Sequence, residues 1–315
     1  MVQRKKKIIR KKVSKKKGSL WGNIVRLFAL IFLLFILVFS VSTVGYVIFF
    51  RTVFAQEILP SIKNAIVFEE PDPPEPVEHV VEEKNIQEPD LPTVAITLPR
   101  VAIIIDDMGH HELLGEELLA LPIELNYSFL PYAPYTRKLE RLAHRAEKTV
   151  LLHLPLQPKG NKWDPGPGAL TIVDLPEVQK NKLEKCLEEV PHAIGVNNHM
   201  GSLYTENQLA MTRLLWEIGD RALFFVDSYT SSKSVGLPIA QRLDVKSARR
   251  NVFLDNILDK KKICAQLDKL INIAERRGVG IGIAHPHRET VEALRSCGDD
   301  YRGRIQYVSI EDVVY

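Results

Sequence analysis

Short apolar runs alternate with longer amphipathic stretches from residue 100 onward. The apolar runs predict strands over 101–105, 123–129, 149–152, 193–196, 222–226, 251–254, 280–284 and 305–310. The amphipathic stretches predict helices over 135–147, 176–189, 206–218, 257–277 and 288–296. This alternation is typical of βα units around a parallel sheet, whose strands are apolar on both faces. We expect an α/β domain over 100–315, either a distorted (β/α) barrel or an open doubly wound sheet.

A different pattern precedes this domain. Ten of the first seventeen residues are Lys or Arg, and residues 27–50 carry no charge. A helix of that length covers about 36 Å, which exceeds the roughly 30 Å of bilayer hydrocarbon. We therefore expect a basic cytoplasmic tail over 1–26 and a single transmembrane signal anchor over 27–50, with the N-terminus inside. A cleaved signal peptide is the alternative, because Val53-Phe54-Ala55 resembles a small-residue cleavage site.

Residues 51–99 have the composition of a linker. Residues 56–99 hold eight Pro and ten Asp or Glu, a mixture that keeps a chain extended and cannot form a packed core. The prediction is a single-pass protein of the inner (cytoplasmic) membrane whose C-terminal domain lies in the periplasm or another extracytoplasmic space.

The net charge of +3 is unevenly distributed. Residues 1–51 carry +12, residues 52–98 carry −8, and the domain is close to neutral. A near-neutral domain gives no support for nucleic-acid binding, and the absence of Walker and Gly-x-Gly-x-x-Gly motifs gives none for a nucleotide. The three cysteines, Cys186, Cys264 and Cys297, predict buried thiols, with one disulfide as the alternative.

Polar residues follow the predicted strands at the points where the apolar runs end. Parallel strands all end at one rim, so these side chains are expected to gather in one site. They are Asp106, Asp107, His153, Asn197, Asn198, His199, Asp227, Asp255 and His285.

Adjacent carboxylates and several histidines at one rim indicate metal-assisted chemistry. Asp106 and Asp107 repel each other unless a cation compensates their charge. Two imidazoles and one carboxylate can hold a divalent ion and leave coordination positions open. A second carboxylate can take a proton from an attacking water, and another histidine can protonate a leaving amine. The set therefore suits hydrolysis of an amide or ester.

Five segments carry a family resemblance. They are Ile-Ile-Asp-Asp-Met-Gly (104–109), His-Leu-Pro-Leu-Gln-Pro (153–158), Gly-Val-Asn-Asn-His-Met-Gly-Ser (195–202), Phe-Val-Asp-Ser (225–228) and Gly-Ile-Ala-His-Pro (282–286). In this order they resemble the divergent polysaccharide deacetylases, distant relatives of NodB-type carbohydrate esterases. The resemblance implies a distorted barrel of the glycoside hydrolase/deacetylase type, a divalent metal, usually Zn²⁺, and removal of N-acetyl groups from amino-sugar polymers such as peptidoglycan.

The resemblance also implies roles for individual residues. Asp106 corresponds to the catalytic base, Asp107 to a metal ligand and His285 to the general acid. His153 and His199 are candidates for the other two ligands by their position at strand ends. We expect substrate contacts from Asn198, Trp163 and Asp227, where Trp163 could stack on a sugar ring from its Gly- and Pro-rich loop.

The expected function is a membrane-anchored, metal-dependent deacetylase of an envelope glycan. The family's His-x-x-x-His, Arg/Pro and Asp/Trp motifs are not recognisable. An inactive barrel that binds carbohydrate or serves envelope assembly is therefore the alternative. An amidase or esterase that acts on another acyl group is a third reading.

Overall fold

The computed structural model describes residues 30, 32–33, 36, 98–160 and 162–315. Among these residues no helix has both the length and the apolar character needed to cross a bilayer. The tail, anchor and linker predicted over 1–26, 27–50 and 51–99 fall outside the described residues, apart from Leu30, Phe32, Leu33, Ile36, Leu98 and Pro99. Contacts divide the chain into Met1–Val67 and Phe68–Tyr315, and the second unit holds the sheet.

The described strands form one parallel sheet. Its strand order is β6-β5-β4-β3-β2-β1-β8-β7, and β9 pairs with the start of β1. The strands are β1 (Arg100–Met108), β2 (Asn126–Phe129), β3 (Val150–Leu156), β4 (Gly195–Met200), β5 (Phe224–Asp227), β6 (Ser247–Arg249), β7 (Val252–Phe253), β8 (Val279–Ala284) and β9 (Gln306–Tyr307).

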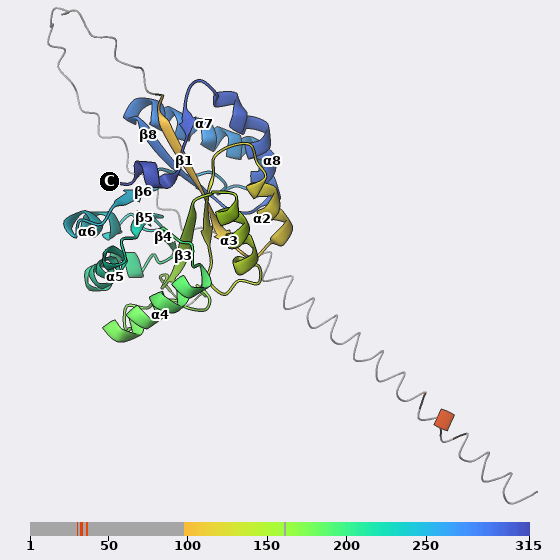
Figure 1. The fold of residues 1–315 in the computed structure, drawn as a ribbon, viewed down its shortest axis with the longest axis vertical. Coiled ribbons are helices and arrows are strands. Elements are labelled where there is room, and N and C mark those ends of the chain that lie inside the picture. Colours follow the sequence, from red (N-terminus) through yellow and green to blue (C-terminus); the bar gives the residue numbers. More distant parts are fainter. Residues whose placement is uncertain (1–29, 31, 34–35, 37–97, 161) are drawn as a thin grey trace, which may run out of the picture. The chain divides into compact units, whose positions relative to one another are not determined.

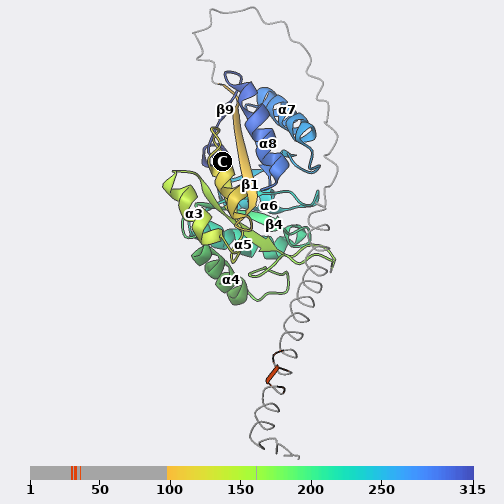
Figure 2. The ribbon, with the colours of Figure 1, turned by 90° about the vertical axis from the view of Figure 1, so that its right-hand side faces the viewer.

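Helices connect the strands and lie around the outside of the sheet (Figures 1 and 2). They are α2 (Glu112–Leu119), α3 (Thr136–Arg145), α4 (Pro176–Glu189), α5 (Gln208–Asp220), α6 (Gly236–Arg242), α7 (Lys260–Arg277) and α8 (Arg288–Cys297). Local signals set their ends. The Asp259 side chain caps the first turn of α7, and Gly278 ends that helix in the left-handed region, where glycine carries no steric penalty.

The sheet curls into a half-barrel. Strands β6 and β7 stand at opposite ends of the strand order, yet only Arg250 and Asn251 separate them along the chain. Three Cα–Cα steps of 3.80 Å bring Arg249 and Val252 within about 11 Å of each other. The two edges of the sheet must therefore approach one another, which excludes the open doubly wound alternative.

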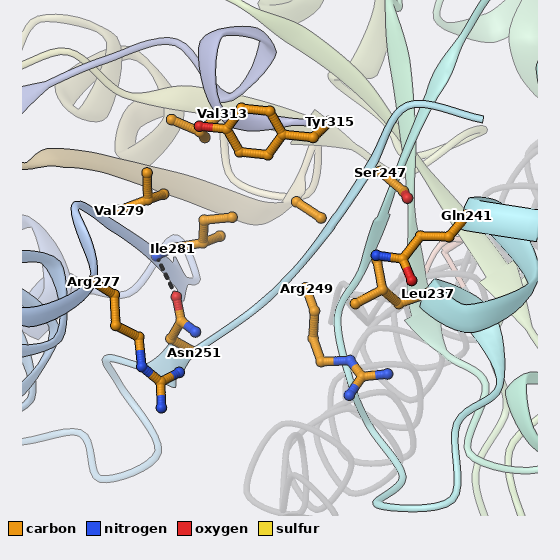
Figure 3. Close-up of a pocket in the computed structure, with 11 residues that line it drawn as sticks. Leu237, Gln241, Ser247, Arg249, Asn251, Arg277, Val279, Ile281, Val313 and Tyr315 are labelled. Atoms are coloured by element: carbon orange, nitrogen blue, oxygen red, sulfur yellow. Dashed lines mark hydrogen bonds between the residues drawn. The ribbon is translucent and has the colours of Figure 1, made fainter. Parts of the chain in front are cut away.

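The gap between these edges, here called the seam, contains a cavity of about 370 Å³ (Figure 3). The side chains of β6 lie on one wall, Val279 and Ile281 of β8 on another, and the Asn251 amide accepts a hydrogen bond from the Ile281 N–H at 2.8 Å. Within the described chain no backbone ladder joins β6 to β7, and Ser247 of β6 instead exchanges two backbone hydrogen bonds with Tyr315.

The two faces of the strands bury different cores. Along β1, Val101, Ile103 and Ile105 pack with the covering helices, whereas Ala102 and Ile104 belong to a separate cluster inside the barrel. This division follows from the period of two in a strand and explains the continuous apolar run at 101–105. Apolar side chains of this second cluster pack inside the barrel, so the polar functional groups lie at the ends of the strands.

One disulfide joins two of the outer helices. Cys264 of α7 and Cys297 of α8 are bonded, with their Cα atoms 6.1 Å apart. Cys186 of α4 remains a buried thiol. The structure therefore has the single disulfide that the sequence left as the alternative. Of the three expected buried thiols, Cys186 is the one that remains.

Candidate functional site

A bulge at the end of β1 places two consecutive carboxylates in one site. Neighbouring side chains of a regular strand point to opposite faces, so Asp106 and Asp107 should diverge. The register between β1 and β2 shifts between Ile105 and Met108, and Asp107 has a φ of 52° in the left-handed region. This turn of the backbone brings both carboxylates toward His153, at 3.7 Å for Asp106 and 3.2 Å for Asp107.

Three ligand atoms converge at this point. Oδ1 of Asp107 lies 2.9 Å from Nδ1 of His199 and 3.2 Å from Nε2 of His153, and the two ring nitrogens lie 3.2 Å apart. The Asp107 oxygen is buried and has no partner with hydrogen-bond geometry. Ligands about 2.0–2.1 Å from a tetrahedral ion stand about 3.3 Å from one another. The triangle formed by Asp107, His153 and His199 therefore fits one face of a divalent metal site.

Asp106 lies beside this triangle and is held by an amide. It is 2% exposed, and its Oδ1 accepts a 2.7 Å hydrogen bond from Nδ2 of Asn197. The amide oxygen of Asn197 in turn lies 2.8 Å from Nδ1 of His153. Asn197 thus touches both a carboxylate and a member of the ligand triangle.

A second carboxylate–imidazole pair lies at the end of β8. Nδ1 of His285 lies 2.9 Å from Oδ1 of Asp255, and Oδ2 of Asp255 accepts from the His285 N–H and from the Thr290 hydroxyl. All three residues are buried. Asp255 therefore orients the His285 ring and determines which ring nitrogen carries the proton.

The environments separate the pKa values of these groups. Burial raises the pKa of Asp106, and the imidazoles of His153 and His285 only partly oppose this. Burial acts in the same direction on Asp107, but His199 and His153 outweigh it and hold the pKa of that carboxyl well below its ordinary range. Two neighbouring carboxylates with opposite shifts are suited to different roles, one as a permanent anion and one as a proton acceptor.

The pKa of His285 moves upward. Burial alone would lower it, but the Asp255 carboxylate, helped by Asp107 and Asp106, raises the pKa of His285 to about 9. The pKa of His153 is also raised, since Asp106 and Asp107 outweigh the effect of burial on that ring. At neutral pH His285 therefore holds a proton that it can donate.

Comparison with known families identifies this arrangement. The model of the divergent polysaccharide deacetylases matches residues 103–314, which include every residue of the site described above. The chain belongs to the divergent polysaccharide deacetylase family. The resemblance carried by the five segments is thereby confirmed, and so is the curled parallel α/β fold that it implies.

Relatives of this deacetylase-family chain are known from several bacteria. It is 34% identical over 201 residues to the uncharacterized protein YibQ of Escherichia coli, and the match covers 62% of this chain and 61% of that protein. An uncharacterized protein of Haemophilus influenzae is 33% identical over 197 residues, with 62% and 70% covered. The crystal structure of an uncharacterized Agrobacterium tumefaciens protein is 27% identical with a TM-score of 0.67, and the match covers 71% of this chain and 92% of that one.

The residues predicted to contact substrate lie in different settings. Asn198 is 1% exposed and bonds the Met200 carbonyl and the Ser228 N–H, while the fully buried Asp227 accepts from the Tyr229 N–H and from Ser234. Both side chains hold the β4 and β5 ends of this deacetylase fold in shape. Their direct contact with a substrate stays a prediction that this packing does not favour. Trp163 lies half-buried on the loop between β3 and α4.

Two residues of the site were not assigned a role from the sequence of this deacetylase-family member. Asn197 precedes Asn198 and His199 in the segment 195–202, and Asp255 follows the sixth predicted strand. Their position at strand ends was the available signal. Their partners lie on other strands, so their roles could be recognised only in the structure.

Proposed function

We propose that this protein is a metal-dependent deacetylase that removes N-acetyl groups from an amino-sugar polymer of the cell envelope. The observation that carries the proposal is the convergence of Asp107, His153 and His199 on one point, with Asp106 beside it and a separate Asp255–His285 pair. Membership of the divergent polysaccharide deacetylase family supports the reaction class.

Asp106 acts as the general base in this proposal. Asp107, His153 and His199 would hold a divalent ion such as Zn²⁺, which would polarise the acetyl carbonyl and acidify an attacking water. Asp106 accepts a proton from the water while the water oxygen forms a bond to the carbonyl carbon. The raised pKa of Asp106 supports this role, because a more basic carboxylate is a better proton acceptor.

His285 acts as the general acid. When the C–N bond breaks, the leaving nitrogen needs a proton, and protonated His285 donates it. The Asp255 carboxylate keeps His285 protonated at neutral pH and stabilises the imidazolium. The products are acetate and the free amine of the sugar.

We also propose that the domain works outside the cytoplasm and is anchored in the inner membrane by 27–50. The eleven Lys and Arg of residues 1–26 favour an inside N-terminus. The Cys264–Cys297 disulfide agrees with an oxidising compartment, since such bonds persist mainly outside the cytosol.

Acetate release tests the reaction. The full-length protein, purified in detergent, is incubated with N-acetylglucosamine oligomers and with peptidoglycan, with and without Zn²⁺ and chelator. We expect acetate from at least one glycan, its loss with chelator and its return with metal. Asp106→Asn should reduce turnover by about 10²–10⁴-fold. Asp268→Asn, which changes an acid that bonds Tyr301 on the outer helices, should leave turnover unchanged.

Absence of acetate with every glycan and metal would overturn the deacetylase proposal. Retained glycan binding in that case would identify a carbohydrate-binding module, and turnover of other acyl groups would identify an amidase or esterase.

Cell fractionation tests the location. Immunoblots should find one full-length species in the membrane fraction, with the domain digested by protease in spheroplasts but not in intact cells. A shorter soluble species would show that the apolar segment is a cleaved signal peptide.

A further inference from the structure

The amide of Asn197 is the most connected polar group of the site. It lies on β4, is fully buried, and bonds side chains that lie on or directly after four other strands. Its Oδ1 lies 2.8 Å from Nδ1 of His153 and accepts a 2.5 Å hydrogen bond from Ser128. Its Nδ2 donates to Oδ1 of Asp106 at 2.7 Å and to the Ser228 hydroxyl at 3.2 Å. All four hydrogen-bonding positions of the amide are therefore occupied.

This network determines the protonation of His153. An ionised carboxylate only accepts hydrogen bonds, so the NH₂ group of Asn197 must face Asp106 and its oxygen must face His153. An amide oxygen also only accepts, and Nδ1 of His153 must then carry the proton. The lone pair is left on Nε2, the atom that faces Asp107 and His199. Such a partner orients a metal-binding ring and raises its basicity.

The same amide determines the orientation of Asp106. It holds Oδ1, while Oδ2 is directed toward the ligand triangle, 3.7 Å from Nε2 of His153. The carboxylate cannot rotate without breaking a buried hydrogen bond, which costs more than an exposed one because the freed groups remain desolvated.

We propose that Asn197 is a positioning residue that prepares His153 as a metal ligand and aims Asp106 at the reacting water. The part that concerns Asp106 rests on the proposed function. The part that concerns His153 does not, because it can be measured as metal affinity without turnover.

Two variants separate these effects. Asn197→Ala removes every contact, and we expect Zn²⁺ affinity to fall about 10–100-fold, with acetate release falling at least as much. Asn197→Asp keeps an oxygen that accepts from His153 and Ser128, but it cannot donate to Asp106 as an ionised group. This variant should bind Zn²⁺ at least as tightly as the wild type, while kcat falls about 10-fold or more at similar KM.

The measurements use the full-length protein. Zn²⁺ affinity is obtained by competition with a chromophoric chelator, and kcat and KM by acetate release. Asn126→Ala is the matched control, because Asn126 is equally buried and its side chain, within the part of the chain that the structure describes, bonds only the backbone of Ile103, Val308 and Ile310. It should lower the thermal midpoint and leave the Zn²⁺ affinity unchanged.

Zn²⁺ affinity of Asn197→Ala within about twofold of the wild type would overturn the proposal, because the partner of a ligand is expected to matter by 10-fold or more. If Asn197→Ala does not fold, Asn197→Asp decides alone, and weakened Zn²⁺ binding by that variant would overturn the role assigned to the amide oxygen. A wild-type protein that binds Zn²⁺ but releases no acetate refutes the proposed function only, and the affinities of the variants still decide the role of Asn197 toward His153.

Discussion

His285 bonds one carboxylate twice. Its ring nitrogen Nδ1 and its own backbone N–H contact the two oxygens of Asp255, at 2.9 and 2.5 Å. The ring and the main chain of the histidine are therefore oriented by a single buried anion, which also stabilises the charged imidazolium.

Asp255→Asn should move the alkaline limb of activity to lower pH. The variant loses the charge that raises the pKa of His285 to about 9, so the histidine loses its proton at a lower pH. The pH profile of kcat/KM measures this shift. Thr290→Val, which removes only the hydroxyl bonded to Oδ2 of Asp255, should shift the limb less. An alkaline limb unchanged in Asp255→Asn would contradict the role of this pair.

The same pair should make the stability of the fold depend on pH. A histidine whose pKa is higher in the folded state stabilises the fold fully below its unfolded pKa of about 6.5, and this contribution is lost as the pH rises through about 9. Denaturant titrations between pH 6 and 10 should therefore show a wild-type decline that is smaller in Asp255→Asn. Parallel curves for the two proteins would refute the expectation.

Substitutions of the two adjacent carboxylates should have different effects. Asp107→Asn replaces a ligand whose Oδ1 faces both imidazoles, and Zn²⁺ affinity should fall more than about 100-fold, beyond the usual effect of a ligand's partner. Asp106→Asn should reduce kcat by about 10²–10⁴-fold with a much smaller effect on affinity. Chelator competition and acetate release measure the two quantities. The opposite pattern would exchange the roles assigned to the two residues.

Gly109→Ala should destabilise the end of β1. Gly109 has a φ of 118°, and a Cβ there would lie 2.3 Å from Oγ1 of Thr136. We expect a loss of about 1–3 kcal/mol in the free energy of unfolding, the usual cost of one strained residue, with weaker Zn²⁺ binding as the adjacent bulge shifts. Gly303→Ala is the control, since its φ is 85° but a Cβ there would meet no atom within 4 Å among the described residues beyond its chain neighbours. Equal losses in both variants would show that backbone strain alone, and not the contact with Thr136, sets the cost.

Reduction should weaken the fold through α7 and α8. Loss of the Cys264–Cys297 bond is expected to lower the free energy of unfolding by about 2–4 kcal/mol. Denaturant titrations should show that reductant destabilises the wild type and Cys186→Ala but not the double variant Cys264→Ser/Cys297→Ser. Insensitivity of the wild type to reductant would contradict the presence of the bond.

The sequence predicted much of the fold because long periodic segments are reliable signals. The helix predicted over 176–189 has those bounds in the structure, and the others differ by a few residues at their ends. The three-residue strand β6 was missed, since Ser247, Ala248 and Arg249 form no apolar run. The eight-residue helix α2 and the seven-residue helix α6 were also missed, and α6 contains Gly236 and Pro238, which have low helix propensity. Such short elements are determined by tertiary packing more than by local preference.

The site was predictable as a gathering of residues at strand ends, but its contacts were not. Placing both Asp106 and Asp107 in it requires a bulge that the sequence does not reveal. The bonds of Asn197 join residues 44, 69 and 91 positions away, and no local pattern encodes such pairs. The sequence identifies each candidate residue, whereas the side chain that it contacts depends on the order of the strands in the sheet.

The seam between β6 and β7 gives the barrel a mechanical property. A ring closed by ladders on every side has a mouth of constant width, because widening it would break backbone hydrogen bonds. This ring is cut at one place, where side chains such as Val279 and Ile281 line a cavity instead. The link of Arg250 and Asn251 nevertheless fixes the width of the cut, because the Arg250 N–H bonds the Asp227 carbonyl and the Asn251 N–H bonds the Ile281 carbonyl. At this place the barrel is therefore closed by the chain itself and not by a ladder.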